Sequence, residues 1–542
     1  MKINKWLLLL VVVMLVCSSV FAAPAKKAAP QLAKVQELRY NLASEPAAVD
    51  PARSTGVIEA NVEFAAFEGL TRIGPNDVPI AGTAERWEVS KDQMSYTFYL
   101  RKNAKWSNGD PVTAQDFEYA WKRALDPKLA AEYAYQLYYI KNGEAYNTGK
   151  ITDPNQLGVK AVNATTLKVS LEAPCPYFLS ITAFPTLLPV HKKIVEANPE
   201  KWAIDAKTYV GNGPFRMVKW VHNERIEFEV NPYYWNKKSI KLTKLTFFLI
   251  EAQSTSLTMF ESNQVDFLDN NGIPNQEVPR LEKAGILKYT PYLGTYYYRF
   301  NTKKAPFNNP KVRRALTLAI DRALLIKVVT KGGQKPALGF VPNGVPDAAP
   351  GSTFRGVGGN FFKDNDLATA KKLLAEAGYP DGKGFPAVEI LYNTSEQHKQ
   401  VAEAIQEMWK KNLGINVTLT NQEWKVYLDN QQHLNYSISR AGWIGDYVDP
   451  MTFMDMFVTN GGNNQTGWSN AKYDKAIDIA KSTGDQKVRM KAMHDAEKIL
   501  MDELPIMPIY YYTNPSLTKK NVQGLRQSAL GFIIFNDAYI TK

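Results

Sequence analysis

The residue types that most often carry out catalysis are not arranged for it in this sequence. The five histidines are scattered, and no two are four residues apart, so the zinc-binding motif His-Glu-x-x-His is absent. The Gly-x-Ser-x-Gly motif of serine hydrolases is absent too. Residues 378–383 (GYPDGK) resemble a phosphate-binding loop only loosely, because one residue is missing and no serine or threonine follows the lysine. We therefore predict no enzyme, no metal site and no cofactor, although paired carboxylates from distant segments leave a secreted hydrolase as an alternative.

Aromatic and amide side chains are abundant in segments that we expect to be loops. Tyrosine triplets occupy residues 296–298 and 510–512, and asparagine pairs occupy residues 270–271 and 463–464. If a triplet lies in a strand, one of its faces packs in the core. The remaining aromatic faces, combined with a few fixed charges, suit a ligand whose ends are charged and whose middle varies.

The first 22 residues have the pattern of a secretory signal peptide. Two lysines precede an apolar run at residues 6–16, and Ala22 and Ala23 provide a small-residue cleavage site. The run is too short to span a bilayer, and no other segment is long and uncharged enough, so we expect an exported, periplasmic protein. Cys17 offers the alternative of a lipid anchor in the membrane, but the bulky Val16 before it fits a lipidation signal poorly.

Length, charge and cysteine content limit the possible architectures. A chain of 542 residues exceeds what one hydrophobic core usually organises, so we expect two or three domains. The net charge is +12, yet lysine and arginine are interleaved with aspartate and glutamate, which predicts a solvated basic surface and no nucleic-acid partner. Once the signal peptide is removed only Cys175 remains, so an internal disulfide is not available.

Short strands alternate with amphipathic helices along the chain, which predicts an α/β fold with contiguous domains. Alternation of apolar and polar residues predicts strands at residues 38–42, 96–100, 167–171, 226–230 and 415–419. Helical spacing predicts helices at residues 367–377 and 398–413, which end at Gly378 and Gly414. Residues 23–35, rich in alanine, proline and lysine, look like a flexible tether.

Several longer motifs follow one another in order over most of the chain. They occupy residues 87–89, 96–98, 100–117, 211–215, 231–235, 305–313 and 440–447. Together they resemble the solute-binding proteins of ABC transporters of the peptide and nickel class (solute-binding protein family 5), over about residues 36–542. Residues 391–395, 398–399, 409–414 and 421–424 are most similar to periplasmic oligopeptide-binding proteins.

That resemblance implies a three-domain, periplasmic-binding-protein-like fold (class II, cluster C) with two lobes and a hinge. Residues 36–80, 205–293 and 514–542 would form a discontinuous domain I, residues 81–204 domain II, and residues 294–513 domain III. The ligand would lie between domains I and III, which close by hinge motion.

The resemblance also implies a receptor that binds peptides of about two to five residues like an added strand. A monomer would deliver them to the membrane permease subunits of an ABC importer. Val57, Gly442 and Ile444 correspond to the backbone contacts, and Asp446 to the aspartate that pairs with the peptide ammonium. The other ligand-binding positions are Arg440 and His398 at the carboxylate end, Trp424, Trp443, Tyr133, Tyr292 and Tyr297 in side-chain pockets, and Asn270 and Asn463 at polar or water-mediated contacts.

Three of these positions also have a structural alternative. Asp446 could be a turn residue before Asp449, and Arg440 and His398 could serve the fold alone. Murein peptide, a nickel chelate or haem are alternative cargoes. Arg440 and Asp446 together favour a zwitterionic peptide, because they offer one charge for each of its ends.

Several pocket positions depart from enteric oligopeptide binders. The two cysteines of their disulfide correspond to Gly294 and Ile444, so that bridge is absent here. Glutamates are replaced by Arg299 and Thr55, an arginine by Gln431, and a lysine by Thr330 with Lys331 adjacent. Because acidic charge is lost, we expect a cargo preference that differs from these relatives and moves towards acidic or neutral peptides.

Overall fold

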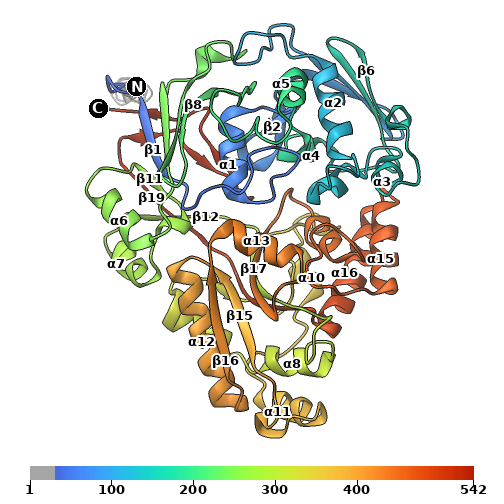
Figure 1. Ribbon diagram of the computed structural model, residues 1–542, viewed down its shortest axis with the longest axis vertical. Coiled ribbons are helices and arrows are strands. Elements are labelled where there is room, and N and C mark those ends of the chain that lie inside the picture. The colour runs from blue at the N-terminus through green and yellow to red at the C-terminus, as the bar shows by residue number, and fades with distance from the viewer. Residues whose placement is uncertain (1–30) are drawn as a thin grey trace, which may run out of the picture.

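The computed structural model describes residues 31–542, which form two bodies lying one above the other (Figure 1). The upper body contains a seven-stranded and a four-stranded sheet, and the lower body contains a six-stranded sheet. The predicted signal peptide and Cys17 lie outside the described residues. A mixed α/β architecture is thus confirmed.

The seven-stranded sheet forms around β1, whose side chains are deeply buried. The strand order is β12 (Leu287–Thr290), β19 (Asn514–Thr518), β11 (Phe267–Leu268), β1 (Glu37–Asn41), β10 (Lys244–Phe248), β9 (Arg225–Val230) and β8 (Phe215–Val221). β1 is parallel to β10 and β11, and the remaining pairs are antiparallel. Tyr40 packs between Phe247 and Phe267, with ring centroids 5.4 Å apart in both pairs. These aromatic contacts fix the register of the central strands.

The six-stranded sheet of the lower body positions most of the candidate ligand-binding residues. Its order is β14 (Lys335–Pro336), β18 (Ile506–Tyr511), β13 (Gly294–Phe300), β17 (Ile438–Ile444), β15 (Val388–Asn393) and β16 (Val417–Gln422). All seven residues of β13 are buried, because strands flank both of its edges and protein covers both of its faces. Tyr296, Tyr297 and Tyr298 have no exposed surface, so neither face of this triplet is free in the described structure, and its expected role in facing a ligand stays a prediction.

The remaining strands form a four-stranded antiparallel sheet and three two-stranded antiparallel sheets. The larger sheet has the order β4 (Ala84–Val89), β5 (Ser95–Leu100), β7 (Thr166–Ser170) and β6 (Val159–Asn163). The two-stranded pairs are β2 (Thr71–Ile73) with β3 (Pro79–Ala81), β20 (Val522–Gln523) with β23 (Tyr539–Ile540), and β21 (Arg526–Gln527) with β22 (Ile533–Ile534).

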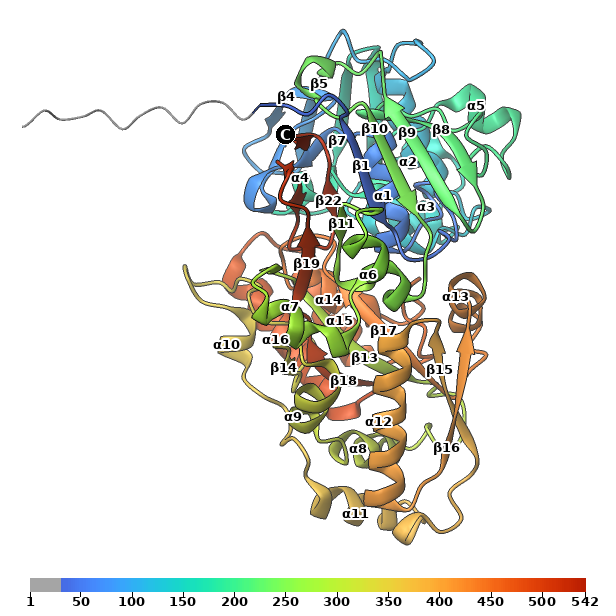
Figure 2. The same ribbon diagram turned by 90° about the vertical axis from the view of Figure 1, so that its left-hand side faces the viewer.

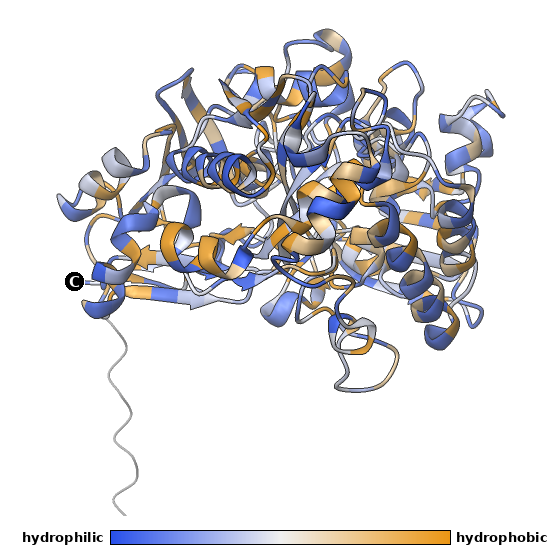
Figure 3. Cartoon of the chain, turned by 90° about the horizontal axis from the view of Figure 1, so that it is seen from below, coloured by the Kyte–Doolittle hydropathy of each residue, from blue (hydrophilic) through white to orange (hydrophobic). Residues whose placement is uncertain are grey.

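The helices pack around the sheets, and many of them carry both hydrophilic and hydrophobic residues (Figure 3). In the upper body they are α1 (Val57–Ala66), α2 (Ala114–Ala124), α3 (Gly143–Asn147), α4 (Phe178–Ile181), α5 (Lys192–Ala197), α6 (Gln253–Glu261) and α7 (Val278–Lys283). In the lower body they are α8 (Pro310–Leu318), α9 (Arg322–Leu325), α10 (Phe354–Gly358), α11 (Leu367–Glu376), α12 (Glu396–Leu413), α13 (Trp424–Gln432), α14 (Met451–Met454), α15 (Ala471–Lys481) and α16 (Gln486–Glu503).

The elements predicted from periodicity are confirmed to within three residues at each end, with one instructive difference. α11 and α12 end next to Gly378 and Gly414, which have positive φ of 95° and 68°. The strand predicted at residues 415–419 begins only at Val417, because the N–H of Ile415 still donates to the carbonyl of Trp409 (3.3 Å) and belongs to the helix end. The aromatic residues expected in loops also lie mainly on strands and helices.

The chain crosses between the two bodies in two adjacent segments, residues 290–294 and 511–514. β12 pairs with β19 above the crossing, and β13 pairs with β18 below it. At the crossing the N–H of Tyr512 donates to the carbonyl of Gly294 (3.0 Å). Figure 2 shows β19 descending towards β18 at this point. Two antiparallel segments joined by few bonds are suited to act as a hinge.

The predicted domain boundaries agree with how the sheets are built, although they stay a prediction. The seven-, four- and six-stranded sheets draw their strands from the residues assigned to domains I, II and III respectively. The predicted tether differs at its end: Leu32 forms a bridge with Thr541, and the N–H of Ala33 donates to the carbonyl of Ile540 (2.9 Å). The ordered upper body therefore begins before residue 36.

Candidate functional site

A cavity of about 210 Å³ lies between the two bodies, and nearly every predicted ligand-binding residue lines it. The upper body contributes the start of α1 and loops around residues 132–133, 184–185 and 270–271. The lower body contributes β17, α13 and the turn around residue 463. The predicted residues that line it are Val57, Tyr133, Asn270, Tyr292, His398, Trp424, Arg440, Gly442, Trp443, Ile444, Asp446 and Asn463.

Tyr297 is the predicted residue that the structure does not bring to the cavity wall. Strand alternation turns it away from Tyr296 and Tyr298, and its ring packs edge-on against Phe340 with centroids 5.3 Å apart. A resemblance between sequences indicates which position a residue occupies, but it does not show which side chains pack around that residue. For Tyr297 the contacts support a role in the core instead.

Asp446 is a buried carboxylate without a cationic partner. Its side chain accepts hydrogen bonds from Gln136 (2.6 Å) and from the hydroxyl of Tyr133 (3.4 Å), and its backbone N–H donates to Thr452 (2.9 Å). Among residues 31–542 no lysine, arginine or histidine lies within ion-pair distance of it. Burial, reinforced by the nearby carboxylate of Asp455, raises the pKa of Asp446 well above its usual value. A ligand ammonium would supply the missing positive charge.

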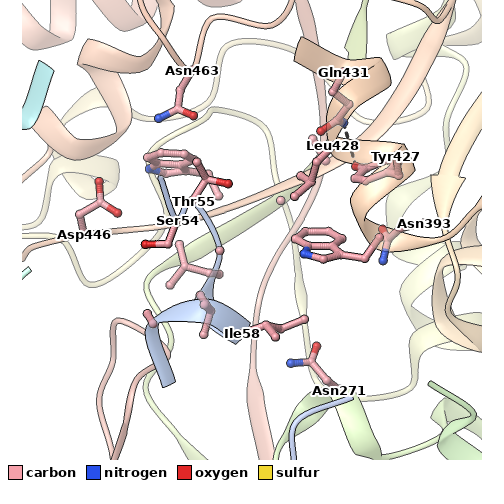
Figure 4. Close-up of a pocket in the computed structure, with 18 of the residues that line it drawn as sticks. Ser54, Thr55, Ile58, Asn271, Asn393, Tyr427, Leu428, Gln431, Asp446 and Asn463 are labelled. Atoms are coloured by element: carbon pink, nitrogen blue, oxygen red, sulfur yellow. Dashed lines mark hydrogen bonds between the residues drawn. The ribbon is translucent and has the colours of Figure 1, made fainter. Parts of the chain in front are cut away.

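Arg440 is the complementary buried cation. Its guanidinium donates to the side-chain oxygen of Asn393 (3.3 Å) and to the hydroxyl of Tyr512 (3.0 Å), and its Nε has no partner in the described structure. Its guanidinium also lies over the ring of Tyr296, 4.7 Å from the centroid. Figure 4 shows Asn393 and Asp446 on opposite sides of the cavity, so Arg440, which contacts Asn393, lies on the side away from Asp446.

His398 lies beside Arg440 but differs from it in charge. Removal from bulk water, together with the positive charge of Arg440, holds the pKa of His398 well below its ordinary value. The ring is neutral at neutral pH, with Nδ1 3.4 Å from the hydroxyl of Tyr296. Of these two neighbouring residues, therefore, Arg440 carries the charge and His398 offers only a neutral hydrogen bond.

One edge of β17 is open to the cavity. β17 pairs with β13 along its whole length, but with β15 only at Ile438 and Ser439. The carbonyl of Arg440 points to this second edge, where it accepts hydrogen bonds from Tyr427 and Gln431 (2.8 Å for Gln431). Because alternate residues of a strand direct their backbone groups to the same edge, those of Gly442 and Ile444 also face the cavity. This geometry is what an added strand requires.

The walls beside that edge explain two further positions. A Cβ on Gly442 would lie 2.4 Å from the hydroxyl of Tyr512, so only glycine fits there without displacement. Gly294 and Ile444, the positions that correspond to the missing disulfide, are direct cross-strand partners. The rings of Trp443 and Tyr133 stack with centroids 6.1 Å apart, so a residue from each body closes the cavity near Asp446.

Across the cavity, the N-terminus of α1 brings Val57 to the wall. Val57 is the first residue of the helix, where backbone N–H groups have no partner within the helix. Glu59, two residues further on in the same turn, accepts a hydrogen bond from the indole nitrogen of Trp424 (3.2 Å), which joins the upper and lower bodies. Burial raises the pKa of Glu59.

Several cavity residues are not among the sequence-predicted ligand-binding positions. They are Glu132, Asn393, Gln397, Tyr427, Gln465 and Tyr512. Asn393 and Tyr512 lie within segments that the sequence singles out, residues 391–395 and 510–512, but nothing in those segments marks these two positions as ligand-binding. Glu132 has no motif around it and reaches the cavity through the packing of distant segments. Within residues 31–542 there is no cluster of three or more acidic, histidine or cysteine side chains able to hold a metal ion.

Comparison with known proteins identifies the family of this chain. A family model described as bacterial extracellular solute-binding proteins, family 5 Middle, matches residues 78–465. The chain belongs to this family. The oligopeptide-binding protein OppA of Bacillus subtilis is 43% identical over 513 residues, which covers 93% of this chain and 92% of that protein. Haemophilus influenzae OppA, solved in complex with the peptide RPPGFSPFR, has a TM-score of 0.87 at 38% identity and covers 94% of this chain and 100% of its own.

Two structures of one relative show that the arrangement of the bodies differs within this family. The Escherichia coli murein tripeptide binding protein MppA has a TM-score of 0.88 at 38% identity, over 94% of this chain and 99% of its own. The unliganded open form of MppA has a TM-score of only 0.62, at the same identity and with coverage of 95% and 99%. Because the sequences are equally similar, the difference lies in how the lobes are placed. The lobes of this family 5 protein are not arranged as in that open form.

The described part of the chain, residues 31–542, contains no helix that is long and apolar enough to cross a membrane.

Proposed function

We propose that this protein is an extracytoplasmic receptor that binds short peptides between its two lobes and delivers them to the permease subunits of an ABC importer. One observation carries the proposal: Asp446 and Arg440, both buried and both without an oppositely charged partner among residues 31–542, lie on opposite sides of the cavity beside the open edge of β17. A peptide in extended form offers an ammonium, a carboxylate and a backbone that fit these three features.

The charges explain why both ends of a peptide are recognised, and the strand edge explains why its sequence can vary. Main-chain hydrogen bonds to Gly442 and Ile444 are available to any residue type. Family membership and the peptide complex of the Haemophilus influenzae relative support the same cargo. That relative holds a nonapeptide, so the proposed range of about two to five residues needs a direct test of length.

The remaining features of the proposal follow from the same comparison. We propose the three-domain division given above, hinge closure at residues 290–294 and 511–514, and a monomer that is exported to the periplasm, with a lipid anchor at Cys17 as the alternative location. Light scattering measures the oligomeric state. Intact-mass analysis of the protein isolated from its host shows whether the signal peptide is cleaved and whether Cys17 is lipidated.

Incubation with a mixture of peptides of two to nine residues, followed by mass spectrometry of the bound and free fractions, tests the function. Intact peptides enriched in the bound fraction are expected. Cleaved peptides would support the secreted hydrolase instead, and the absence of enrichment would contradict both. Calorimetry with murein tripeptide, nickel chelate and haem compares the other cargoes; tighter binding of one of these would overturn the assignment to ordinary peptides.

A further inference from the structure

Arg299 is a buried charge in the cavity wall that the peptide termini leave unused. It lies on β13 with 5% of its surface exposed, and its guanidinium lines the cavity. Its Nη1 donates only to neutral amide oxygens, those of Gln431 (3.0 Å) and Gln465, and its Nε has no partner in the described structure. A buried guanidinium with this environment is destabilising unless a further acceptor is supplied.

The other buried arginines show what this protein does when an arginine serves the fold. Arg322, Arg355 and Arg489 each pair with a carboxylate, and Arg313 donates to three backbone carbonyls at the end of α16 and near α8. Only Arg299 and Arg440, among the buried arginines of residues 31–542, have neither arrangement. Both arginines line the cavity, so a group of the bound ligand is in reach to accept hydrogen bonds from their unpaired guanidinium nitrogens.

Strand register separates the two arginines into different positions along a bound chain. Arg440 is the cross-strand partner of Tyr298, and Arg299 is the partner of Ser439. Residues paired in this way project to the same face, so the two guanidiniums lie on opposite faces of the sheet. A peptide added to β17 directs its side chains alternately to these faces. If Arg440 holds the terminal carboxylate, Arg299 meets a side chain.

The surroundings of Arg299 define what that side chain is. Gln465 lies between Arg299 and Glu132: its oxygen accepts from the arginine, and its nitrogen donates to Glu132 (3.0 Å). Glu132 belongs to the upper body and lines the same cavity. The positive charge of Arg299 acts against the rise that burial causes in the pKa of Glu132, but no ion pair joins the two among the described residues. The pocket therefore offers a cation that no carboxylate of residues 31–542 pairs with directly, with amides beside it, and this matches a ligand carboxylate in charge and in hydrogen-bonding geometry.

We propose that Arg299, Gln431 and Gln465 form a subsite that selects an acidic side chain of the bound peptide. The inference rests on the proposed peptide-binding function and adds the chemical class of one side chain to it. It also gives a physical location to the preference for acidic or neutral peptides expected from the sequence.

The proposed subsite is tested by calorimetry with a set of tetrapeptides. In this set Glu, Gln or Lys replaces each alanine of Ala-Ala-Ala-Ala in turn. At one position we expect the Glu peptide to bind at least tenfold more tightly than the isosteric Gln peptide, and the Lys peptide to bind most weakly. Arg299→Gln should abolish the ratio of Glu to Gln affinities, and Arg299→Glu should reverse the preference towards Lys. A reversed preference is a gain that misfolding does not produce, and thermal unfolding of each variant checks the fold.

Arg280→Gln, an exposed arginine on α7 that pairs with surface glutamates, is the matched control and should keep the wild-type ratio. Equal affinities for Glu and Gln peptides at every position of the wild-type protein would overturn the subsite. A ratio that survives in Arg299→Gln would overturn the role of Arg299. Failure of Ala-Ala-Ala-Ala and all its derivatives to bind would instead contradict the proposed function itself.

Discussion

Gln136 donates a hydrogen bond from its side-chain nitrogen to the carboxylate of Asp446, 2.6 Å away, and so joins the two bodies of the protein. Gln136 comes from the upper body and Asp446 from the segment that follows β17 in the lower body. Both are buried, and neither donor to Asp446 carries a charge. The carboxylate is therefore held in place by both lobes while its need for a cation remains unmet, which is the condition for recognising an ammonium.

The first prediction concerns protons. Because burial raises the pKa of Asp446 in the ligand-free protein, and a bound ammonium would lower that pKa, peptide binding should release a proton at pH values between the two. Affinity should then fall as the pH is lowered through this range, because protonation competes with the ammonium. Calorimetry in buffers of different protonation enthalpy measures the release. Identical heats in all buffers across pH 4–8 would contradict it.

The open edge of β17 can be tested at its glycine. In Gly442→Ala the new methyl group would meet the hydroxyl of Tyr512 at 2.4 Å and disturb both the edge and the partner of Arg440. We expect peptides of any sequence to bind at least tenfold more weakly, a loss of about 1.4 kcal/mol. Gly484→Ala, where an added Cβ has only Pro174 nearby at 3.3 Å, is the control. An unchanged affinity in Gly442→Ala would show that the peptide lies elsewhere.

The hydrogen bond between Trp424 and Glu59 should contribute to lobe closure. Trp424→Phe retains an aromatic ring but loses the indole N–H, so the bond of 3.2 Å between the bodies is lost. A neutral donor to a buried acceptor is worth about 0.5–1.5 kcal/mol, so we expect affinity to fall roughly two- to tenfold for all peptides alike. Small-angle scattering of the ligand-free variant should show a more extended particle. A loss restricted to certain peptides would point to direct contact with their side chains instead.

The buried carboxyl of Asp455 should make the free energy of unfolding depend on pH. Burial raises its pKa to about 6 despite Lys481, whose Nζ lies 3.6 Å away. The folded state thus retains a proton that the unfolded state loses above pH 4, so this group lowers the free energy of unfolding as the pH rises from about 4 to 6. Asp455→Asn should remove that decline and stabilise the protein at pH 7 by up to about 3 kcal/mol. Denaturant titrations at pH 4.5 and 7 measure it; an equal decline in the variant would contradict the assignment.

Local pattern accounts for the parts of this fold that could be predicted. α11 and α12 follow from helical periodicity closed by glycines with positive φ, and the strands follow from alternation. Asp446, Arg440 and Gly442 were found because they share one continuous motif, which the structure places on β17 and its C-terminal extension.

Contacts between distant segments account for the rest. Glu132 lines the cavity and Gln136 contacts Asp446, both from a short helical turn more than 300 residues before their partners Gln465 and Asp446, and no pattern in their own segment marks them. Tyr297, which the resemblance assigns to a side-chain pocket, does not line the cavity in the structure, because its strand is buried on both faces and its ring packs against Phe340. The neutral state of His398 likewise depends on its burial next to Arg440.

The pairing of Asp446 with a peptide ammonium is the central claim of the proposed function. A double-mutant cycle measures it: calorimetry with one peptide in free and N-acetylated forms, each against the wild-type protein and Asp446→Asn. Asp446→Asn should weaken the free peptide at least tenfold, about 1.4 kcal/mol, and leave the acetylated peptide unaffected. Equal losses for both peptides, or none for either, would contradict the claim that this carboxylate anchors the amino end of the cargo.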